Sequence, residues 1–296
     1  MDRSKLSKVA GGALSVFRAA IALCLFIFSD FIVYFIFDIS GIDTDVYNGL
    51  CTTLSAVATI IIFAVYNILS GRGGSKIIKT RRLSALELCL IIVVALGLLG
   101  FVDTYLSIAG MISDYFESLK NAIKDYSQSV DRYADVDSVK VPVWDNVLYT
   151  LSMFILIPVR EELIFRGAVF GELEKGFKPG VAVFLASVVF GAMHGLSVHI
   201  GYAFVCGLVI TCCYYYTKSL WAAVVVHSVF NFFGSSLHYI IYSGYLGIPA
   251  QTADAISRNV TFVMIAMMVP AVIAFVALIR ISRQRKQGAP RIDEQT

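Results

Sequence analysis

The chain has 296 residues, of which 58% are hydrophobic, 13% aromatic and 15% charged. A soluble domain carries about 25% charged residues, so this chain has too little polar surface to cover a soluble globule of its size. The apolar content excludes disorder, and a net charge of +3 spread over short basic clusters argues against a nucleic-acid partner. The six cysteines lie in apolar stretches without a CxxC pair, so neither a disulfide framework nor a thiolate metal site is predicted.

Eight apolar runs are long enough to cross about 30 Å of hydrocarbon. They cover residues 17–37, 46–69, 85–109, 146–165, 181–198, 201–216, 219–241 and 260–279. These runs predict an all-α, polytopic membrane helix bundle with about eight transmembrane helices in contact with membrane lipid. We expect one integral membrane domain over 1–296. Its parts are N-terminal helices in 1–144, a core that carries the chemistry in 145–241, a last helix at 260–279 and a basic tail at 280–296.

The basic residues predict an orientation, because cytoplasmic segments of membrane proteins carry an excess of Lys and Arg. With the N-terminus inside, eight spans place 19 of the 24 Lys and Arg residues in the cytoplasm and 5 outside. Arg160 and Arg166 are among the 19. We therefore expect a multi-pass protein of the cell membrane with both termini in the cytoplasm.

The outer segment 110–144 is polar by composition but carries a helical apolar stripe. The stripe consists of Ile112, Phe116, Leu119, Ile123, Tyr126, Val130 and Tyr133. It predicts an amphipathic helix that lies on the outer membrane surface or packs within the protein, and packing against a partner is the alternative.

Ionisable side chains inside a span cost a few kcal/mol or more, so they tend to face cavities and to carry chemistry. The predicted spans contain Asp30, Glu87, Asp103, Arg160, Glu161, Glu162, Arg166, His194 and His227, together with the polar Asn231. Asp30 has no basic neighbour in sequence, and we assign it no role. His199 and His238 lie near outer span ends, match no motif and are expected to be interfacial.

The fourth span carries two adjacent glutamates with different expected roles. Glu162 and Arg166 are four residues apart and therefore lie on one helix face, which predicts that Arg166 neutralises Glu162. Glu161 points about 100° away around the helix and is free to accept a proton from water. Pro158 has no N–H to donate to the carbonyl four residues earlier, so we expect a loosened helix just before the acids. By depth, Glu161 falls near the inner end of its predicted span.

Two further helices add histidines and an amide. His227 and Asn231 are four residues apart and project from one face of the seventh span. His194 shares a face of the fifth span with Ser187 and Gly191, whose small side chains allow another helix to approach closely. A carboxylate, two imidazoles and a carboxamide can activate water and stabilise an oxyanion, so peptide-bond hydrolysis is the natural reaction. The sequence contains neither GxSxG nor HExxH, which argues against a serine hydrolase and a zincin.

Three short motifs carry a family resemblance. Residues 161–166 read EELIFR and match EExxxR, residues 190–194 read FGAMH and match FxxxH, and residues 227–231 read HSVFN and match HxxxN. In these residues the sequence resembles the CPBP intramembrane proteases, the Abi and CAAX-protease-like group related to the Rce1-type prenyl endopeptidase. The resemblance covers roughly residues 145–233, about a third of the chain.

The resemblance implies a membrane bundle with a cavity open to the cytoplasm, in which Glu161 and His194 activate water while His227 and Asn231 hold the oxyanion. It leaves metal participation open. A divalent ion such as Zn²⁺ could be held by Glu161, His194 and His227, with a fourth position for water, or Glu161 could act as a general base without metal. The expected substrate is a membrane-associated peptide or protein, and a prenylated protein is one option.

Two other functions also place acids and histidines inside a membrane bundle. A non-catalytic binder, such as an immunity protein, would keep the pocket and act by sequestration. A proton-coupled transporter would be expected to have two related halves, whereas the polar residues here cluster in one half. The sequence therefore favours the endopeptidase.

Overall fold

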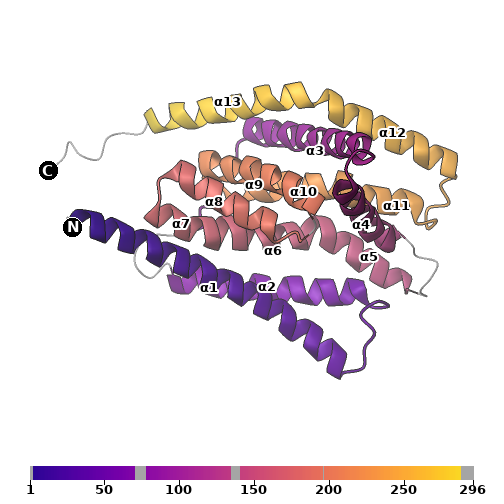
Figure 1. Cartoon of the computed structure of the whole chain (residues 1–296), viewed down its shortest axis with the longest axis horizontal. Coiled ribbons are helices and arrows are strands. Elements are labelled where there is room, and N and C mark those ends of the chain that lie inside the picture. Colours follow the sequence, from indigo (N-terminus) through magenta and orange to yellow (C-terminus); the bar gives the residue numbers. More distant parts are fainter. Residues whose placement is uncertain (1–2, 71–77, 135–140, 196, 288–296) are drawn as a thin grey trace.

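The computed structural model describes residues 3–70, 78–134, 141–195 and 197–287, and every regular element in these ranges is a helix (Figure 1). The elements are α1 (Arg3–Ile39), α2 (Asn48–Ser70), α3 (Ala85–Ser113), α4 (Glu117–Ala134), α5 (Val143–Leu151), η2 (Ser152–Leu156), α6 (Ile157–Glu162), η3 (Leu163–Val169), α7 (Phe170–Gly176), α8 (Pro179–Ala192), α9 (Ser197–Thr217), α10 (Leu220–Asn231), η4 (Phe232–Ser236), α11 (Leu237–Tyr242), α12 (Ala250–Ala266) and α13 (Met268–Gln287). The η elements are π-helical. The predicted all-α class is confirmed.

The helices run back and forth between two ends of an elongated bundle (Figure 1). At one end, here called the termini end, lie the start of α1, the end of α13 and the segments 79–87, 174–178 and 217–219. Ion pairs join these segments: Lys79 pairs with Glu174, and Arg285 at the end of α13 pairs with Glu87 at the start of α3. Both described ends of the chain therefore lie on the same side of the bundle.

The opposite end, here called the far end, holds α4 and the connections 40–47 and 243–249. There α5 begins beside α2, and the carboxylate of Asp145 accepts the backbone N–H groups of Gly49 at 2.7 Å and Leu50 at 2.8 Å. This contact caps the N-terminus of α2 with a negative charge. A Cβ atom at position 49 would lie 1.9 Å from the carbonyl oxygen of Asp145, so only glycine allows this approach.

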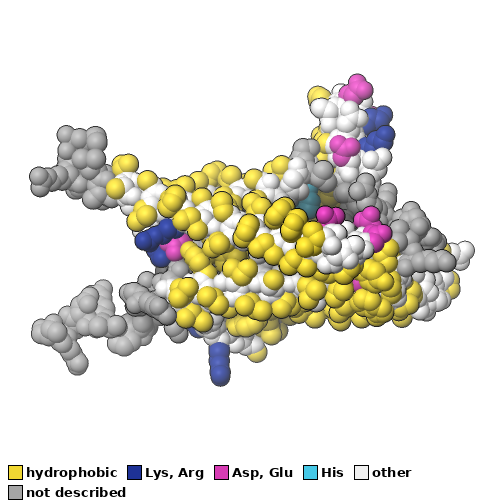
Figure 2. Space-filling model, turned by 90° about the horizontal axis from the view of Figure 1, so that it is seen from below, with side chains coloured by type: hydrophobic (Ala, Val, Ile, Leu, Met, Phe, Trp, Pro, Cys, Tyr) yellow, Lys and Arg dark blue, Asp and Glu magenta, His cyan; other side chains and the backbone are white. Residues whose placement is uncertain are grey.

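The helices have the length and apolarity of a multi-pass membrane protein. Among the described residues, five ranges pass both criteria: Val9–Ile39, Asn48–Leu69, Ala85–Ser113, Val198–Thr217 and Leu220–Tyr242. If the pair α12 and α13, bent by 47°, is counted as one span, it makes a sixth. Figure 2 shows a face that is mostly hydrophobic, with charged side chains toward the two ends. The count of eight spans and the cytoplasmic termini stay predictions.

The fourth predicted span is part of one continuous helix, residues 143–176, formed by α5, η2, α6, η3 and α7 and here called the motif helix. The loosening expected before Pro158 is present, because η2 ends at Leu156 and the N–H of Ile157 donates to the carbonyl of Ser152, five residues back. The helix continues to Gly176, eleven residues beyond the predicted span, so Glu161 lies near its middle rather than near its inner end. π-Helical turns occur frequently at functional sites.

Two other predicted boundaries differ from the structure. The fifth predicted span, 181–198, is shorter, because α8 ends at Ala192 and Gly195 has a positive φ of 73° that ends the helical geometry. The predicted tail 280–296 is helical as far as Gln287, since α13 continues to that residue. Residues 288–296 lie outside the described part of the chain.

The amphipathic segment predicted at 110–144 contains the end of α3 and the whole of α4. In α4, Tyr126 packs within the protein: the hydroxyl of Tyr202 donates to that of Tyr126 at 3.2 Å, and the ring of His199 lies 6.0 Å from the Tyr126 ring. The intramolecular packing that was one of the expected arrangements is therefore present. Residues 135–140 of this segment are not among those described.

Candidate active site

The site begins with a buried ion pair on the motif helix. Nη1 of Arg166 donates to Oε1 of Glu162 at 2.9 Å, and both side chains are almost completely buried. The guanidinium carbon of Arg166 also lies 4.3 Å from the ring centroid of Phe190 in α8, within cation–π distance. The predicted neutralisation of Glu162 by Arg166 is confirmed, because the two side chains occupy neighbouring turns of one helix.

His227 joins this pair from α10. Its Nδ1 atom lies 2.7 Å from Oε1 of Glu162, while its Nε2 atom lies 3.9 Å from Oε2 of Glu161. The ion-paired carboxylate of Glu162 accepts the Nδ1 proton, so the ring is fixed with Nε2 toward Glu161. The two glutamates therefore act on opposite sides of the same imidazole, and Glu161, whose side chain is 18% exposed, is the more accessible carboxylate.

Asn231 is held one turn further along α10. Its Nδ2 group donates to the backbone carbonyl of Met153 at 2.9 Å. That carbonyl is free because the N–H of Ile157 bonds to Ser152 in the π-helical register, and Pro158, the next residue, has no N–H. The contact fixes the orientation of the amide and leaves the second N–H of Nδ2 for another acceptor.

His194 lies in the turn after α8 rather than inside the predicted fifth span. Its Nδ1 atom is 2.7 Å from the carbonyl oxygen of Phe190, and because a carbonyl only accepts, Nδ1 carries a proton. The neutral ring therefore has a free lone pair on Nε2. The Phe190 ring lies near both histidines, with centroid distances of 4.6 Å to His194 and 6.2 Å to His227.

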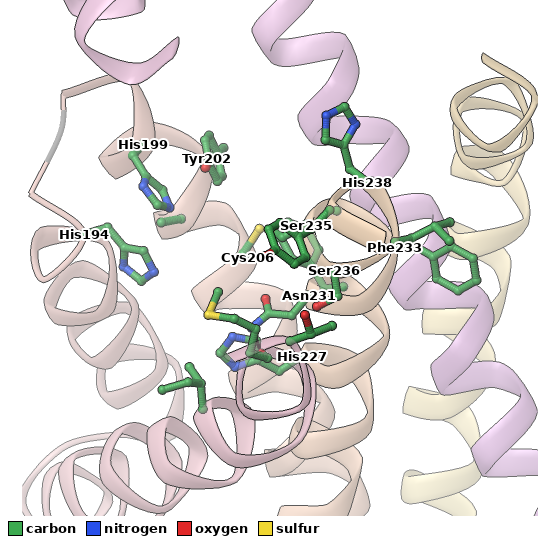
Figure 3. Close-up of a pocket in the computed structure, with 18 of the residues that line it drawn as sticks. His194, His199, Tyr202, Cys206, His227, Asn231, Phe233, Ser235, Ser236 and His238 are labelled. Atoms are coloured by element: carbon green, nitrogen blue, oxygen red, sulfur yellow. Dashed lines mark hydrogen bonds between the residues drawn. The ribbon is translucent and has the colours of Figure 1, made fainter. Parts of the chain in front are cut away.

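One cavity of about 790 Å³ collects the four predicted catalytic residues Glu161, His194, His227 and Asn231 on its wall. In Figure 3, His194 and His199 lie on one side of this cavity and His227 and Asn231 on another. Glu162 and Arg166 are not among the lining residues and support His227 from behind. The structure thus brings the carboxylate, the two imidazoles and the amide to the wall of a common space, with His194 on the side opposite His227 and Asn231.

His199 was expected to be interfacial and was not predicted as part of the site. In the structure it lines the cavity, and its ring centroid lies 4.5 Å from that of His194 and 4.7 Å from that of Tyr202. His238 lines the same cavity. The available signal was the spacing of His199 from His194, because a turn at Gly195 brings the start of α9 back toward the end of α8.

From the sequence, Asp30 had no expected partner, and Arg160 was expected to lie in the cytoplasm. The two side chains pair inside the bundle, with Nη1–Oδ1 and Nη2–Oδ2 distances of 3.0 and 3.2 Å. Nη1 of Arg160 also contacts Oγ of Ser55 at 2.9 Å. This bidentate pair ties α1 and α2 to the motif helix at the residue that precedes Glu161.

The predicted metal ligands Glu161, His194 and His227 do not form a three-ligand site in this arrangement. Within the described ranges, no three His, Cys, Asp or Glu side chains are grouped closely enough to hold a metal ion. Nδ1 of His227 is engaged by Glu162, which leaves Nε2 toward the cavity, and His194 lies across that cavity. A divalent ion held by Glu161, His194 and His227 stays a prediction, and the steps that follow are derived for the side chains and water.

A helical membrane bundle with these four side chains around one cavity defines a candidate membrane hydrolase. Residues 143–233 match the family model described as Type II CAAX prenyl endopeptidase Rce1-like. A search of curated proteins and a search of solved structures each found no match. The resemblance stated from the three motifs is thus confirmed: the match runs from the start of the motif helix to just beyond α10 and supports a protease.

Proposed function

We propose that this protein is an intramembrane endopeptidase that hydrolyses a peptide bond of a membrane-associated peptide or protein. The observation that carries the proposal is the common cavity of Glu161, His194, His227 and Asn231, which come from three separate parts of the bundle. Each of these side chains has a polar group available toward that space. The Rce1-like match over residues 143–233 supports the same reaction class.

Water activation falls to Glu161 and His194. Glu161 is not engaged by Arg166 and faces the cavity, so its carboxylate can take a proton as the water oxygen attacks the peptide carbonyl carbon. The free Nε2 lone pair of His194 gives a second acceptor on the other side of the water. When the C–N bond breaks, the proton taken from water passes to the leaving amine, so the reaction consumes one water and leaves the enzyme unchanged.

Oxyanion stabilisation falls to His227 and Asn231. Asn231 offers its second Nδ2 proton from a position fixed by the Met153 carbonyl. His227 is fixed by Glu162 and presents an N–H at Nε2 when its ring carries both protons. Donors held in place before the reaction need no reorganisation as negative charge develops on the carbonyl oxygen, which is why such groups accelerate acyl transfer.

The experiment uses purified protein in lipid vesicles with a library of peptides and mass-spectrometric detection of products. The wild type is expected to cleave a subset of peptides, and Glu161→Ala and His227→Ala are each expected to abolish the same cleavages. Equal cleavage by all three proteins would contradict the proposal. A Glu161→Gln variant that keeps a cellular protective effect while cleaving nothing would favour the non-catalytic binder instead.

A further inference from the structure

The cavity extends from the catalytic residues toward one end of the bundle. On the motif helix, its lining residues begin at Tyr149 and stop at Glu161, so they all lie on the far-end side of that glutamate. On α10 and α11 they begin at His227 and continue to Ile241, again toward the far end. On α9 they begin at His199, near the start of the helix, and stop at Ile210, so the part of α9 nearest the termini end does not line the cavity.

The remaining lining residues show the same distribution. They include Asn48 and Thr52 in the first turns of α2, Tyr126 in α4, Ser235 and Ser236 in η4, and Ser257 in α12. All of these positions lie in the half of the bundle that ends at the far-end connections. The cavity is thus open space between the catalytic residues and the far end.

The other side of the catalytic residues is closed by packed side chains. Phe165 and Phe170 on the motif helix, Tyr214 on α9 and Val226 on α10 are each at most 2% exposed. The rings of Phe170 and Tyr214 meet edge to face at 5.8 Å. Large interlocked side chains of this kind leave no path for a peptide between the site and the termini end.

The described basic residues distinguish the two ends of the bundle. At the termini end lie Lys79, Arg81, Arg82, Lys175, Lys178, Lys218, Arg280, Arg283 and Arg285. The described far-end segments contain Lys120, Lys124, Arg132 and Arg258 together with acidic residues such as Asp43, Asp45 and Asp114. By the positive-inside rule, the termini end is the cytoplasmic one. Arg160 and Arg166 lie inside the bundle and are counted at neither end. The termini end still has more basic residues than the far end.

The sequence predicted cytoplasmic termini and, through the family resemblance, a cavity open to the cytoplasm. The structure does not allow both. If the termini are cytoplasmic, the cavity cannot open toward the cytoplasm, because it extends to the opposite end. From this geometry and the basic residues, we infer that the cavity is entered from the extracytoplasmic side. The inference about substrate rests on the proposed endopeptidase function: the substrate is a peptide segment exposed on the extracytoplasmic face of the membrane.

The lining gives the chemistry of that segment. The wall toward the far end is rich in neutral hydrogen-bonding groups, with Tyr149, Thr150, Ser235 and Thr261 among its residues, and Asp103 is its second carboxylate besides Glu161. Such a wall can bind the backbone of an extended, uncharged peptide through hydroxyl groups. A lipidated protein presented from the cytoplasm would instead meet the packed side of the site.

Cysteine labelling tests the direction of entry without depending on catalysis. Ser235 is exposed and lines the cavity, while Lys178 is exposed at the termini end, so Ser235→Cys and Lys178→Cys form a matched pair. Each variant is expressed in the plasma membrane of intact cells and treated with a membrane-impermeant maleimide. Permeabilised cells give full labelling, and the unaltered chain measures the background from its six native cysteines.

We expect Ser235→Cys to be labelled in intact cells to the same extent as in permeabilised cells, and Lys178→Cys to rise from background only after permeabilisation. Labelling of Ser235→Cys that requires permeabilisation would overturn the inference, as would labelling of Lys178→Cys in intact cells. Adding Glu161→Gln to the Ser235→Cys chain is expected to leave the labelling unchanged. The inference can therefore fail while the proposed function stands, and the proposed function can fail while the labelling pattern holds.

Discussion

Nδ1 of His227 lies 2.7 Å from Oε1 of Glu162, although 65 residues separate them in the chain. The same carboxylate oxygen accepts Nη1 of Arg166 at 2.9 Å, and Glu162 and Arg166 are both almost completely buried. Glu162 therefore holds a histidine in place. Glu161, its neighbour in sequence, is left as the carboxylate that faces the cavity.

Replacing Glu162 with Gln is expected to lower both stability and activity. The variant keeps the shape of the side chain but leaves the buried guanidinium of Arg166 without its counter-charge, which costs about 3–5 kcal/mol when one partner of a buried pair is removed. It also removes the charge that orients His227. Thermal unfolding in detergent and peptide cleavage in vesicles measure the two effects.

A double variant, Glu162→Gln with Arg166→Met, separates these effects. Removing both charges takes away the buried uncompensated cation, so the free energy of unfolding is expected to recover toward the wild-type value. Activity is expected to stay low, because His227 still lacks the carboxylate. A double variant less stable than Glu162→Gln alone would show that the ion pair is not the source of the loss.

The amide of Asn231 is expected to act mainly in the transition state. Asn231→Ala should lower kcat by about 10²–10³, the usual cost of one oxyanion-hole donor, with a small change in KM. Asn48→Ala removes an amide from the same cavity near the start of α2 and serves as the matched control. Steady-state kinetics in vesicles measure both, and a loss confined to KM would contradict the assigned role.

The imidazole of His194 is expected to contribute as an acceptor of the water proton. His194→Gln should lower kcat by about 10²–10⁴, the range for general acid–base groups. His238→Phe changes another histidine on the cavity wall while keeping a ring beside Tyr242, and it should leave kcat within a few-fold of the wild type. Equal effects of the two substitutions would argue that His194 only shapes the cavity.

The ion pair of Asp30 and Arg160 is expected to position the residue next to it, Glu161. Asp30→Asn leaves the mostly buried Arg160 without its charged partner and should lower the melting temperature together with kcat. Adding Arg160→Gln removes the unpaired charge and should restore the melting temperature while kcat stays reduced. Full recovery of kcat in the double variant would show that the pair stabilises the fold without positioning Glu161.

Much of this site could be predicted because it consists of polar residues within apolar helices. Such residues stand out by their cost in lipid, and spacing within one helix identified the pair of Glu162 and Arg166. Pro158 predicted the loosened turn in the same way, within one helix, because its missing N–H removes a defined backbone hydrogen bond. The helical class followed from the long apolar runs, although the motif helix extends past its predicted end to Gly176 and α8 stops before its predicted end, at Ala192.

Contacts between helices could not be predicted in this way. Asp30 and Arg160 are 130 residues apart, and no periodicity relates positions on different helices. The end of the bundle toward which the cavity extends could not be predicted either, because it depends on which side of Glu161 is filled by large side chains such as Phe170 and Tyr214. His199 was missed because a residue at a span end is normally near the membrane surface, whereas here the cavity reaches that end.

Peptide-bond cleavage by Glu161 and its neighbours is tested most sharply in membranes. The peptide termini in membranes that contain the wild type are compared with those in membranes that contain Glu161→Gln at equal abundance. We expect new termini with the wild type that are missing with Glu161→Gln, located in segments exposed on the extracytoplasmic side. Identical sets of termini in the two membranes would contradict it.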